Sequence, residues 1–384
     1  MAQGPLNGVR IVEFAGIGPG PFCGMLLSDL GADVIRIDRK GDGRPGRAAD
    51  VMSRGRRSIG LNLKDPADVE TALKLIEKAD GLIEGFRPGV MARLGLGYPE
   101  LDQRNPGLVY CSISGYGQTG PDTARPAFAP IINAASGFTM GEFRYQRGRE
   151  KPERSRNLSA DALGATHALI AILAALRQRS ITGKGDHLDV ELLAGLMNMM
   201  PFELQEAQFP DPELKVPVFD PVACADGYIV VAPVTAKNFE AMARACERLD
   251  WMQDPRFATP LARMQNWPKL IAEVEVWAAP LTAAEAAQRI DAAGCPCNKY
   301  LTPAEALENP QLAARRSVVE IEDAMGRHKV VNTPFRFTNA TVGISGLAPH
   351  LGGDTDAVLS EILALDDTQL RDLHARKVTR SGKD

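Results

Sequence analysis

Asp161 is the residue whose type and surroundings best suit covalent chemistry in this sequence. It stands near the start of a long segment rich in alanine and leucine, and its neighbours are small and apolar. A carboxylate with few polar neighbours is a candidate nucleophile or general base when it faces a cleft. A carboxylate in the first turn of a helix can equally act as an N-cap or as a partner of the helix dipole. The residues alone leave both interpretations open.

Basic residues in two short segments are candidates for binding phosphate groups. Arg39 and Lys40 follow an apolar run, and Arg87 and Arg93 lie on either side of a Pro-Gly pair. The planar guanidinium group of arginine suits phosphate recognition. Both segments can also be solvated surface loops, and their sequences do not decide between the two interpretations.

Residues 16–21 (GIGPGP) form a glycine-rich turn that is a third candidate. Glycines let backbone amides approach an anion, and a helix that follows presents its positive N-terminus. The pattern is not G-x-G-x-x-G, and its prolines lack amide donors, which argues against a dinucleotide pyrophosphate. An ordinary turn between a strand and a helix is the alternative.

Other catalytic or metal-binding patterns are not supported. His167 comes six residues after Asp161 and therefore lies on a different helix face, and we interpret both His167 and His187 as structural. The six cysteines are scattered, and only Cys295 and Cys297 are close together. The five histidines are not spaced with them as a zinc site requires. We expect no metal, and most of the cysteines to be reduced and buried.

Strand and helix patterns alternate in the part of the chain that must position these candidates. The sequence predicts strands at 9–14, 33–38, 58–63, 81–84, 108–113 and 187–190, and helices at 22–30, 66–79, 90–94, 160–178 and 196–200. Parallel strands joined by crossover helices form a three-layer α/β domain. Ligands of such sheets bind beyond the carboxyl ends of the strands.

A second module begins near residue 219. The sequence predicts a strand at 227–232, helices at 236–248, 267–279 and 283–293, and one or two helices in the tail at 354–375. We therefore expect a large domain over residues 1–205, a small α/β domain over 219–330, and a C-terminal segment, 331–384, that returns to the large domain.

Composition restricts the class of protein. The chain has 384 residues, of which 45% are hydrophobic and 24% charged, with a net charge of −4. This length favours two domains, and the charge gives no support for a nucleic-acid partner. The first residues lack the features of a signal peptide, and no long apolar stretch is free of charge. We expect a cytoplasmic protein with no membrane segment.

Several segments, taken in order, resemble the family III CoA-transferases (CaiB/BaiF type), a group that includes the α-methylacyl-CoA racemases. They are 5–14 (PLNGVRIVEF), 30–38 (LGADVIRID), 57–64, 84–95, 114–121 (SGYGQTGP), 172–176 (ILAAL), 182–185 (TGKG) and 254–257 (DPRF). The resemblance implies a Rossmann-like large domain and a smaller α/β domain. It also implies a homodimer whose two chains interlock as linked rings.

The resemblance implies a site as well. Coenzyme A, or an acyl-CoA, would be bound as a substrate by the large domain, with Arg39 and Arg93 at its nucleotide and phosphates. Lys64, Arg87 and the turn that contains Gly18 are further candidates for binding it. Asp161 falls at the position of the catalytic aspartate. It would attack the acyl-CoA thioester and form an anhydride and then an aspartyl-CoA thioester, while glycine-loop amides stabilise the oxyanion and a closing loop keeps water out.

Two departures from the family pattern matter for the reaction. The racemases carry a histidine at the position of Phe128, and phenylalanine cannot carry a proton. The transferases carry a glutamine at the position of Gly18, and the turn at 16–21 is closer to that of the racemases. The sequence predicts a transferase that moves coenzyme A from an acyl-CoA to a free carboxylic acid. A racemase or epimerase with another base and a non-catalytic, CoA-binding subunit are the alternatives.

Overall fold

The computed structural model describes residues 4–39, 51–146, 148–152, 156–209, 219–323 and 326–375. The chain forms two compact units. The first contains Met1–Leu204 together with Leu312–Asp384, and the second is the continuous segment Gln205–Gln311. The chain therefore leaves the first unit once and returns to it once.

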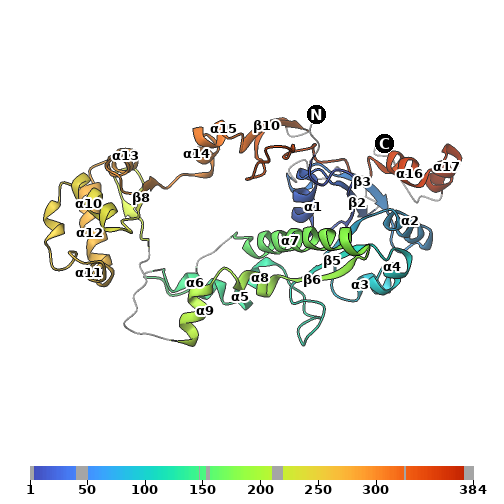
Figure 1. The fold of residues 1–384 in the computed structure, drawn as a ribbon, viewed down its shortest axis with the longest axis horizontal. Helices are drawn as coiled ribbons and strands as arrows, with labels where there is room; N and C mark the ends of the chain where they lie inside the picture. The colour runs from blue at the N-terminus through green and yellow to red at the C-terminus, as the bar shows by residue number, and fades with distance from the viewer. Residues whose placement is uncertain are drawn as a thin grey trace. The chain divides into compact units, whose positions relative to one another are not determined.

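A six-stranded parallel sheet organises the first unit (Figure 1). Its strands are β1 (Arg10–Phe14), β2 (Asp33–Arg39), β3 (Arg57–Leu61), β4 (Gly81–Glu84), β5 (Val109–Ser114) and β6 (Asp186–Glu191). They lie in the order β3-β2-β1-β4-β5-β6, and every neighbouring pair is parallel. The strand order therefore reverses between β1 and β4. Ligands of parallel sheets bind beyond the carboxyl ends of the strands at such a reversal.

The strands of this sheet are buried on both faces. In β1, Ile11 packs into the core on one face, whereas Val12 and Phe14 pack into the core on the other. Ile83 and Leu82 of β4 divide between the same two cores. Successive side chains of a strand point to opposite faces, so two covered faces require continuous apolar runs.

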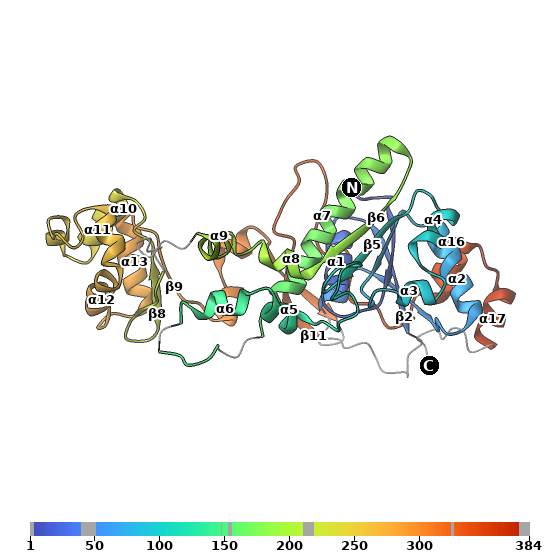
Figure 2. The same ribbon diagram turned by 90° about the horizontal axis from the view of Figure 1, so that it is seen from below.

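Helices cover both faces of the sheet (Figure 2). The helices that share one core with the strands are α1 (Pro19–Asp29), α5 (Ala129–Ala135), α6 (Phe138–Phe143), α7 (Ser159–Thr182) and α8 (Leu192–Met197). Those that share the other are α2 (Pro66–Glu77), α3 (Val90–Arg93), α4 (Tyr98–Arg104), α16 (Thr355–Leu363) and α17 (Asp367–Ala375). The predicted α/β fold with a parallel sheet is confirmed. Two further short elements are η1 (Val51–Ser53) and α9 (Pro201–Gln208), and the division between the two units falls within α9, after Leu204.

The boundaries of α1 follow from its glycines and prolines. The helix begins at Pro19, earlier than the predicted residue 22, because Pro19 and Pro21 occupy the first helical positions. A proline there loses no hydrogen bond, since the first amides of a helix have no partner within it. Gly31, with φ of 98°, follows the C-cap residue Leu30, as predicted for a glycine stop.

α7 is the central helix of the first unit. Its length and composition would suit a membrane span, although the sequence predicted no such segment. Gly164, Ala168 and Ile172 are buried in the core that α7 shares with the sheet. A Cβ on Gly164 would clash with the side chain of Leu192 in α8. One side of α7 therefore packs in the core of the first unit.

The chain returns to the first unit at Leu312, whereas the sequence had placed the return at residue 331. The hairpin of β10 (Val318–Asp323) and β11 (Gly326–Val331) follows the short helix α15 (Pro310–Ala314) and belongs to the first unit. A hairpin pattern in a sequence does not show on which unit the hairpin packs. Beyond it, the Gly343 amide donates to the Asp29 carbonyl at 2.8 Å and the Ser58 amide to the Asp354 carboxylate at 2.8 Å.

The second unit has a small antiparallel sheet and a core of its own. The strands are β7 (Val222–Ala223), β8 (Tyr228–Val231) and β9 (Cys297–Lys299). The helical elements are α10 (Ala236–Ala245), η2 (Leu249–Met252), α11 (Pro260–Gln265), α12 (Trp267–Ala278), α13 (Ala283–Ala293) and α14 (Pro303–Leu307). Phe239, Trp251 and Leu270 are fully buried in this core. Thr235 and Thr282 form capping boxes at the starts of α10 and α13, which explains where these helices begin.

Candidate active site

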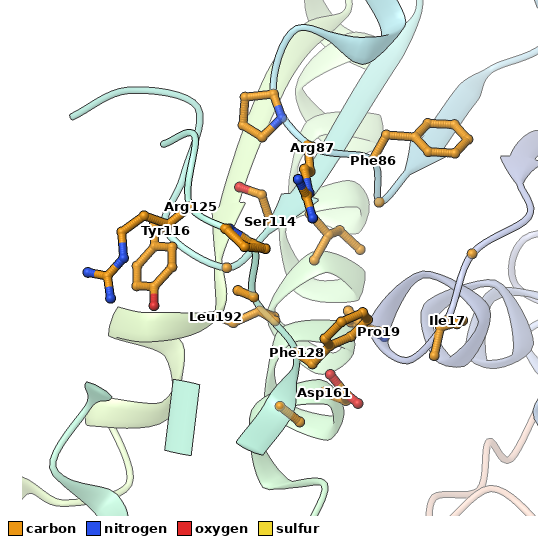
Figure 3. A pocket seen from close by; sticks show the side chains of 18 of the residues that line it. Ile17, Pro19, Phe86, Arg87, Ser114, Tyr116, Arg125, Phe128, Asp161 and Leu192 are labelled. Carbon is orange, nitrogen blue, oxygen red and sulfur yellow. The ribbon is translucent and has the colours of Figure 1, made fainter. Parts of the chain in front are cut away.

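A cavity of about 1060 Å³ opens at the carboxyl ends of the strands of the first unit. Residues that follow β1, β4 and β5 line it, together with the end of β2 and residues at the starts of α5, α7 and α8. Figure 3 shows side chains from these elements pointing into one space. The cavity therefore lies at the reversal of strand order, where a parallel sheet binds its ligands.

Asp161 lies in the first turn of α7 and lines this cavity. The N-cap of α7 is Leu158, and no side chain caps the helix, so Asp161 is not the N-cap. Its side chain is half-buried, and no described residue forms a hydrogen bond or an ion pair with the carboxylate. Burial raises the pKa of the Asp161 carboxyl, with no opposing positive charge. A carboxylate that faces a cavity and is partly withheld from water suits nucleophilic attack.

The turn between β1 and α1 lies directly against this carboxylate. Gly18 has φ of 80°, a conformation that glycine adopts far more readily than other residues. A Cβ on Gly18 would lie 2.8 Å from Cγ and Oδ2 of Asp161 and 2.9 Å from Oδ1. Only glycine therefore fits between the turn and Asp161 as they stand. Among the described residues the amides of Ile17 and Gly18 donate no backbone hydrogen bond. Ile17 lines the cavity, whereas Gly18, a predicted binding residue, is not among the residues that line it.

A buried ion pair fixes the start of α1 beside this turn. Arg56 Nε lies 3.0 Å from Oε2 of Glu13 in β1, and both side chains are fully buried. Arg56 also donates to the backbone oxygens of Pro21, in the first turn of α1, and of Met52. Gly24 of α1 packs where a Cβ would clash with the Glu13 carboxylate. Sequence reasoning did not select this pair, because an arginine within a basic run gives no signal of burial.

Two of the predicted phosphate-binding residues line the cavity. Arg39 is the last residue of β2, and Arg87 lies in the loop after β4; both are exposed. The carboxylate of Asp38, next to Arg39, accepts hydrogen bonds from Arg36 at 2.9 Å and from Ser58 at 2.6 Å. The Asp38 carboxylate thus already has hydrogen-bond partners within the protein. The cavity therefore has one arginine at the end of β2 and one after β4, the two strands that pair with β1 on either side.

The other two predicted basic residues lie outside the cavity. Lys64 and Arg93 are exposed and are not among the residues that line it. Lys64 follows β3, and Arg93 ends the short helix α3 that follows β4. Lys40 lies outside the described residues. The structure thus brings Arg39 and Arg87 to the same cavity as Asp161, but not Lys64 or Arg93.

Sequence reasoning missed three polar residues of the cavity wall. Ser114 ends β5, and Tyr116 follows it. Their hydroxyls are buried and have no hydrogen-bond partner among the described residues. The Arg125 guanidinium lies 5.1 Å from the centre of the Tyr116 ring and forms an ion pair with Asp122 at 2.9 Å. The glycine-rich segment 114–120 was the signal that could have led to this wall.

Glu84 supports the loop that carries Arg87. Its carboxylate accepts a hydrogen bond from the Phe86 amide at 2.8 Å and another from the Ser112 hydroxyl. Ser112 also shares a hydrogen bond of 3.0 Å with Nε2 of His187, whose ring stacks on Tyr98. Burial raises the pKa of Glu84 to about 7. His187 is thus part of the support beneath the loop, in agreement with its structural interpretation.

The described residues contain no group of three or more histidine, cysteine, aspartate or glutamate side chains arranged to hold a metal ion. The six cysteines are free. His167 is not among the residues that line the cavity, whereas Phe128, at the start of α5, is.

Comparison with known proteins gives a consistent family over nearly the whole chain. The sequence model of CoA-transferase family III matches residues 6–355. The succinyl-CoA–D-citramalate CoA-transferase of Chloroflexus aurantiacus is 30% identical, over 97% of this chain and 98% of its own. The acetyl-CoA:oxalate CoA-transferase of Acetobacter aceti is 34% identical, over 83% of this chain and 86% of its own.

Solved structures agree with these matches. The Mycobacterium tuberculosis protein Rv3272 has a TM-score of 0.82 at 28% identity, over 93% of this chain and 99% of its own. A CAIB/BAIF family protein from Brucella suis has a TM-score of 0.81 at 27% identity, over 94% of this chain and 100% of its own. The similarity thus includes both units of the chain.

Proposed function

The chain belongs to CoA-transferase family III and is a CoA-transferase, and we propose that it moves coenzyme A from an acyl-CoA to a free carboxylic acid through Asp161. The observation that carries the proposal is the half-buried carboxylate of Asp161, which has no protein partner and faces the cavity at the carboxyl edge of the sheet. Acyl-CoA and the acid are the substrates, and the steps below use no metal.

The first half of the reaction loads coenzyme A onto the enzyme. The Asp161 carboxylate attacks the thioester carbonyl, the carbon–sulfur bond breaks, and a mixed anhydride and a CoA thiolate result. The thiolate then attacks the aspartyl carbonyl of the anhydride. This step releases the first acid as its carboxylate and leaves an aspartyl-CoA thioester, so the acyl energy is retained.

The second half reverses these steps with another acid. The carboxylate of the acceptor attacks the aspartyl-CoA thioester, releases the CoA thiolate and forms a second mixed anhydride. The thiolate attacks the acyl carbonyl that came from the acceptor. The new acyl-CoA leaves, and Asp161 is again a free carboxylate.

The residues around Asp161 suit these steps. Each attack on a carbonyl develops a negative charge on oxygen, which amide donors stabilise when they are already in place. The Ile17 amide, which donates no backbone hydrogen bond, belongs to a residue that lines the cavity and is the donor proposed here, and Gly18 lies against the Asp161 carboxylate. The raised pKa of Asp161 reflects a less solvated and therefore more reactive carboxylate.

We propose Arg39 and Arg87 as the cavity residues that bind the phosphates of coenzyme A. Both present exposed guanidinium groups at the carboxyl edge of the sheet, a geometry suited to bidentate phosphate binding. Lys64 and Arg93 follow the same edge and are proposed contacts for the part of the ligand that extends beyond the cavity. Arg93→Ala should weaken CoA binding more than it slows the reaction.

The racemase alternative needs two groups that exchange a proton, one on each side of the α-carbon. Phe128 lines the cavity where the family's racemases carry the second group, and it has no exchangeable proton. The cavity and the unpartnered aspartate also give no reason for a non-catalytic subunit. We therefore propose transfer alone.

We also propose that the large unit has a Rossmann-like fold. We further propose that the protein is a homodimer of interlocked chains in the cytoplasm. The strand order supports the first, because it is the order of doubly wound nucleotide-binding sheets. Family membership supports the second, and the free cysteines suit a reducing compartment. Light scattering of the purified protein would measure the number of chains per particle.

The test of the proposed function is a thioester-exchange assay. The protein is incubated with a panel of acyl-CoAs and free acids in deuterated water, and products are identified by mass spectrometry. We expect new CoA thioesters only when an acid is present. Deuterium at the α-carbon without a new thioester would instead establish proton exchange and contradict the proposal.

Asp161→Ala should lower transfer by roughly 10³-fold or more, because no other group can form the anhydride. Its affinity for coenzyme A, measured by calorimetry, should change little. Asp102→Ala is the matched control, since Asp102 is exposed on α4 and outside the cavity. Normal turnover by the Asp161 variant would refute the site assignment.

A further inference from the structure

We propose that the cavity accepts an apolar monocarboxylic acid, whose hydrocarbon chain lies against Ile17, Phe128 and Leu158. The inference rests on the proposed function, because it names the class of acid that Asp161 exchanges. Three features of the cavity suit such an acid: exposed apolar side chains in the wall that contains Asp161, nearby charges that are already paired, and polar groups in another part of the wall.

Three large apolar side chains of the cavity wall are open to solvent. Ile17 is 83% exposed, Phe128 is 65% exposed and Leu158 is 54% exposed. Single exposed apolar residues are common on protein surfaces. Three that line one cavity are not scattered, and such a group marks a surface that an apolar partner covers.

These three side chains come from three segments that meet at Asp161. Ile17 directly precedes Gly18, which lies against the Asp161 carboxylate. Leu158 is the N-cap of α7, three residues before Asp161, and residues at that spacing share a helix side. Phe128, at the start of α5, lines the same cavity as Asp161 (Figure 3). An acyl group attached to Asp161 would therefore have apolar neighbours.

No cation in the described part of the cavity pairs with the Asp161 carboxylate. Among the described residues that line it, the cationic side chains are Arg39, Arg87 and Arg125. Arg125 is already paired with Asp122 and lies over the Tyr116 ring. No positive charge opposes the effect of burial on the pKa of Asp161. A second carboxylate held against Ile17, Phe128 and Leu158 would lose water without gaining a partner, which is costly.

The polar groups of the cavity lie in a different part of its wall. In the view of Figure 3, Arg87 and Ser114 lie above the level of Asp161, and Tyr116 and Arg125 lie to its left. The exposed guanidinium groups of Arg39 and Arg87 suit the phosphates of coenzyme A. The polar side would then hold the carrier, and the apolar side the acyl chain.

The first test uses the wild-type protein. With the best acyl-CoA donor of the panel, kcat/KM is measured for straight-chain acids from acetate to octanoate and for oxalate, succinate and L-malate. We expect kcat/KM to rise about fourfold for each methylene group that becomes buried, until the cavity is filled. The best monocarboxylate should exceed the best dicarboxylate by roughly 30-fold or more.

The second test changes the wall. Ile17→Arg and Phe128→Arg should each lower kcat/KM for the longest good acid by roughly tenfold or more and shift the preference toward dicarboxylates. Phe128→Ala, which adds no charge, should reduce the gain per methylene group. Ile131→Arg is the matched control, because Ile131 is 48% exposed on α5 but does not line the cavity.

The results of these tests distinguish a wrong class of acid from a wrong proposed function. New thioesters formed preferentially from dicarboxylates by the wild type would overturn the inference and leave the proposed function intact. No new thioester from any acid would overturn both. If the arginine variants altered the oligomeric state but not the acid preference, the three side chains would contact a second copy of the chain, and the inference would again be wrong.

Discussion

At the scale of single residues, the environment of Asp161 decides its chemistry. A carboxylate in the first turn of a helix is ordinary, but here it has no partner, is half-buried and lies against a glycine that cannot gain a side chain without displacing it. We therefore expect a substitution of Gly18 to impair the reaction, as a substitution of Asp161 should. Two predictions belong to this scale.

The first prediction concerns Gly18. Gly18→Ala should lower kcat by about 100-fold, because the new Cβ would meet the Asp161 carboxyl group at 2.8 Å and displace it from its attacking position. Gly8→Ala is the control for backbone strain, since Gly8 also has positive φ, 85°, but a Cβ there meets no atom within 4 Å. Both variants should lose about 1–3 kcal/mol of stability. Equal kcat values for the two variants would show that the contact with Asp161 is unimportant.

The second prediction concerns the pH dependence of protein stability that the buried carboxyl group of Glu84 causes. Its pKa is raised from 4.5 to about 7 in the folded protein, so the folded state binds a proton that the unfolded state has already lost. The free energy of unfolding should therefore fall by about 3 kcal/mol as the pH rises from about 4.5 to about 7. Glu84→Gln keeps an acceptor for the Phe86 amide but removes this titration.

Urea unfolding at pH 5 and pH 8 measures the effect. The difference in unfolding free energy between the two pH values should be smaller for Glu84→Gln than for the wild type. Glu100→Gln, at an exposed position on α4, is the control and should behave like the wild type. An unchanged pH dependence in Glu84→Gln would mean that Glu84 titrates normally.

At the scale of elements, α1 and the turn before it must be held in place for Gly18 to meet Asp161. The Arg56–Glu13 pair does this from beneath, because Arg56 joins β1 to the first turn of α1 through Pro21. Burial raises the pKa of Glu13 and Arg56 opposes that effect, so the two side chains depend on each other.

The third prediction compares two neighbouring arginines. Arg56→Ala should lower the free energy of unfolding by about 3–5 kcal/mol, because it leaves Glu13 buried without a partner. Arg57→Ala should cost about 1 kcal/mol or less, since its pairs with Asp33 and Glu361 are partly exposed. The double variant Glu13→Leu with Arg56→Met should recover most of the loss. Similar costs for the two alanine variants would contradict this interpretation of the pair.

At the scale of the whole molecule, the first unit is formed by two segments of the chain and the second unit by one. The first unit needs two distant segments: Ser58 of β3 donates to Asp38 and accepts from the Gly352 amide, and so links the sheet edge to the returning segment. Leu351 of that segment lines the cavity. The second unit is continuous and has its own core.

The fourth prediction is that residues 219–311 fold as an isolated fragment. The three tryptophans of the chain, Trp251, Trp267 and Trp277, all lie in this segment, so their fluorescence reports its unfolding. The fragment should show a cooperative urea transition and the emission of buried tryptophan, because its core uses none of the first unit's residues. A fragment with a random-coil circular dichroism spectrum would show that the second unit depends on the rest of the chain.

The sequence by itself determined the parallel α/β fold, most strand and helix positions and the candidate nucleophile. Strand and helix periodicity, glycine stops and turn residues act over a few neighbours, and so β4 and α13 match their predicted ranges at both ends. The ordered family motifs predicted Asp161, Arg39 and Arg93, with Lys64 and Arg87 as weaker candidates. Of these, Asp161, Arg39 and Arg87 line the cavity at the carboxyl edge that any parallel sheet offers to a ligand.

Only the tertiary structure decided the rest, because it depends on residues far apart in the chain. The burial of Arg56 against Glu13, the contact of Gly18 with Asp161 and the support of the Arg87 loop by Glu84 cannot be read from local patterns. The same is true of the hairpin at 318–331, whose strands look alike whichever unit they pack on. The apolar wall of Ile17, Phe128 and Leu158 likewise exists only because three separate segments meet at one carboxylate.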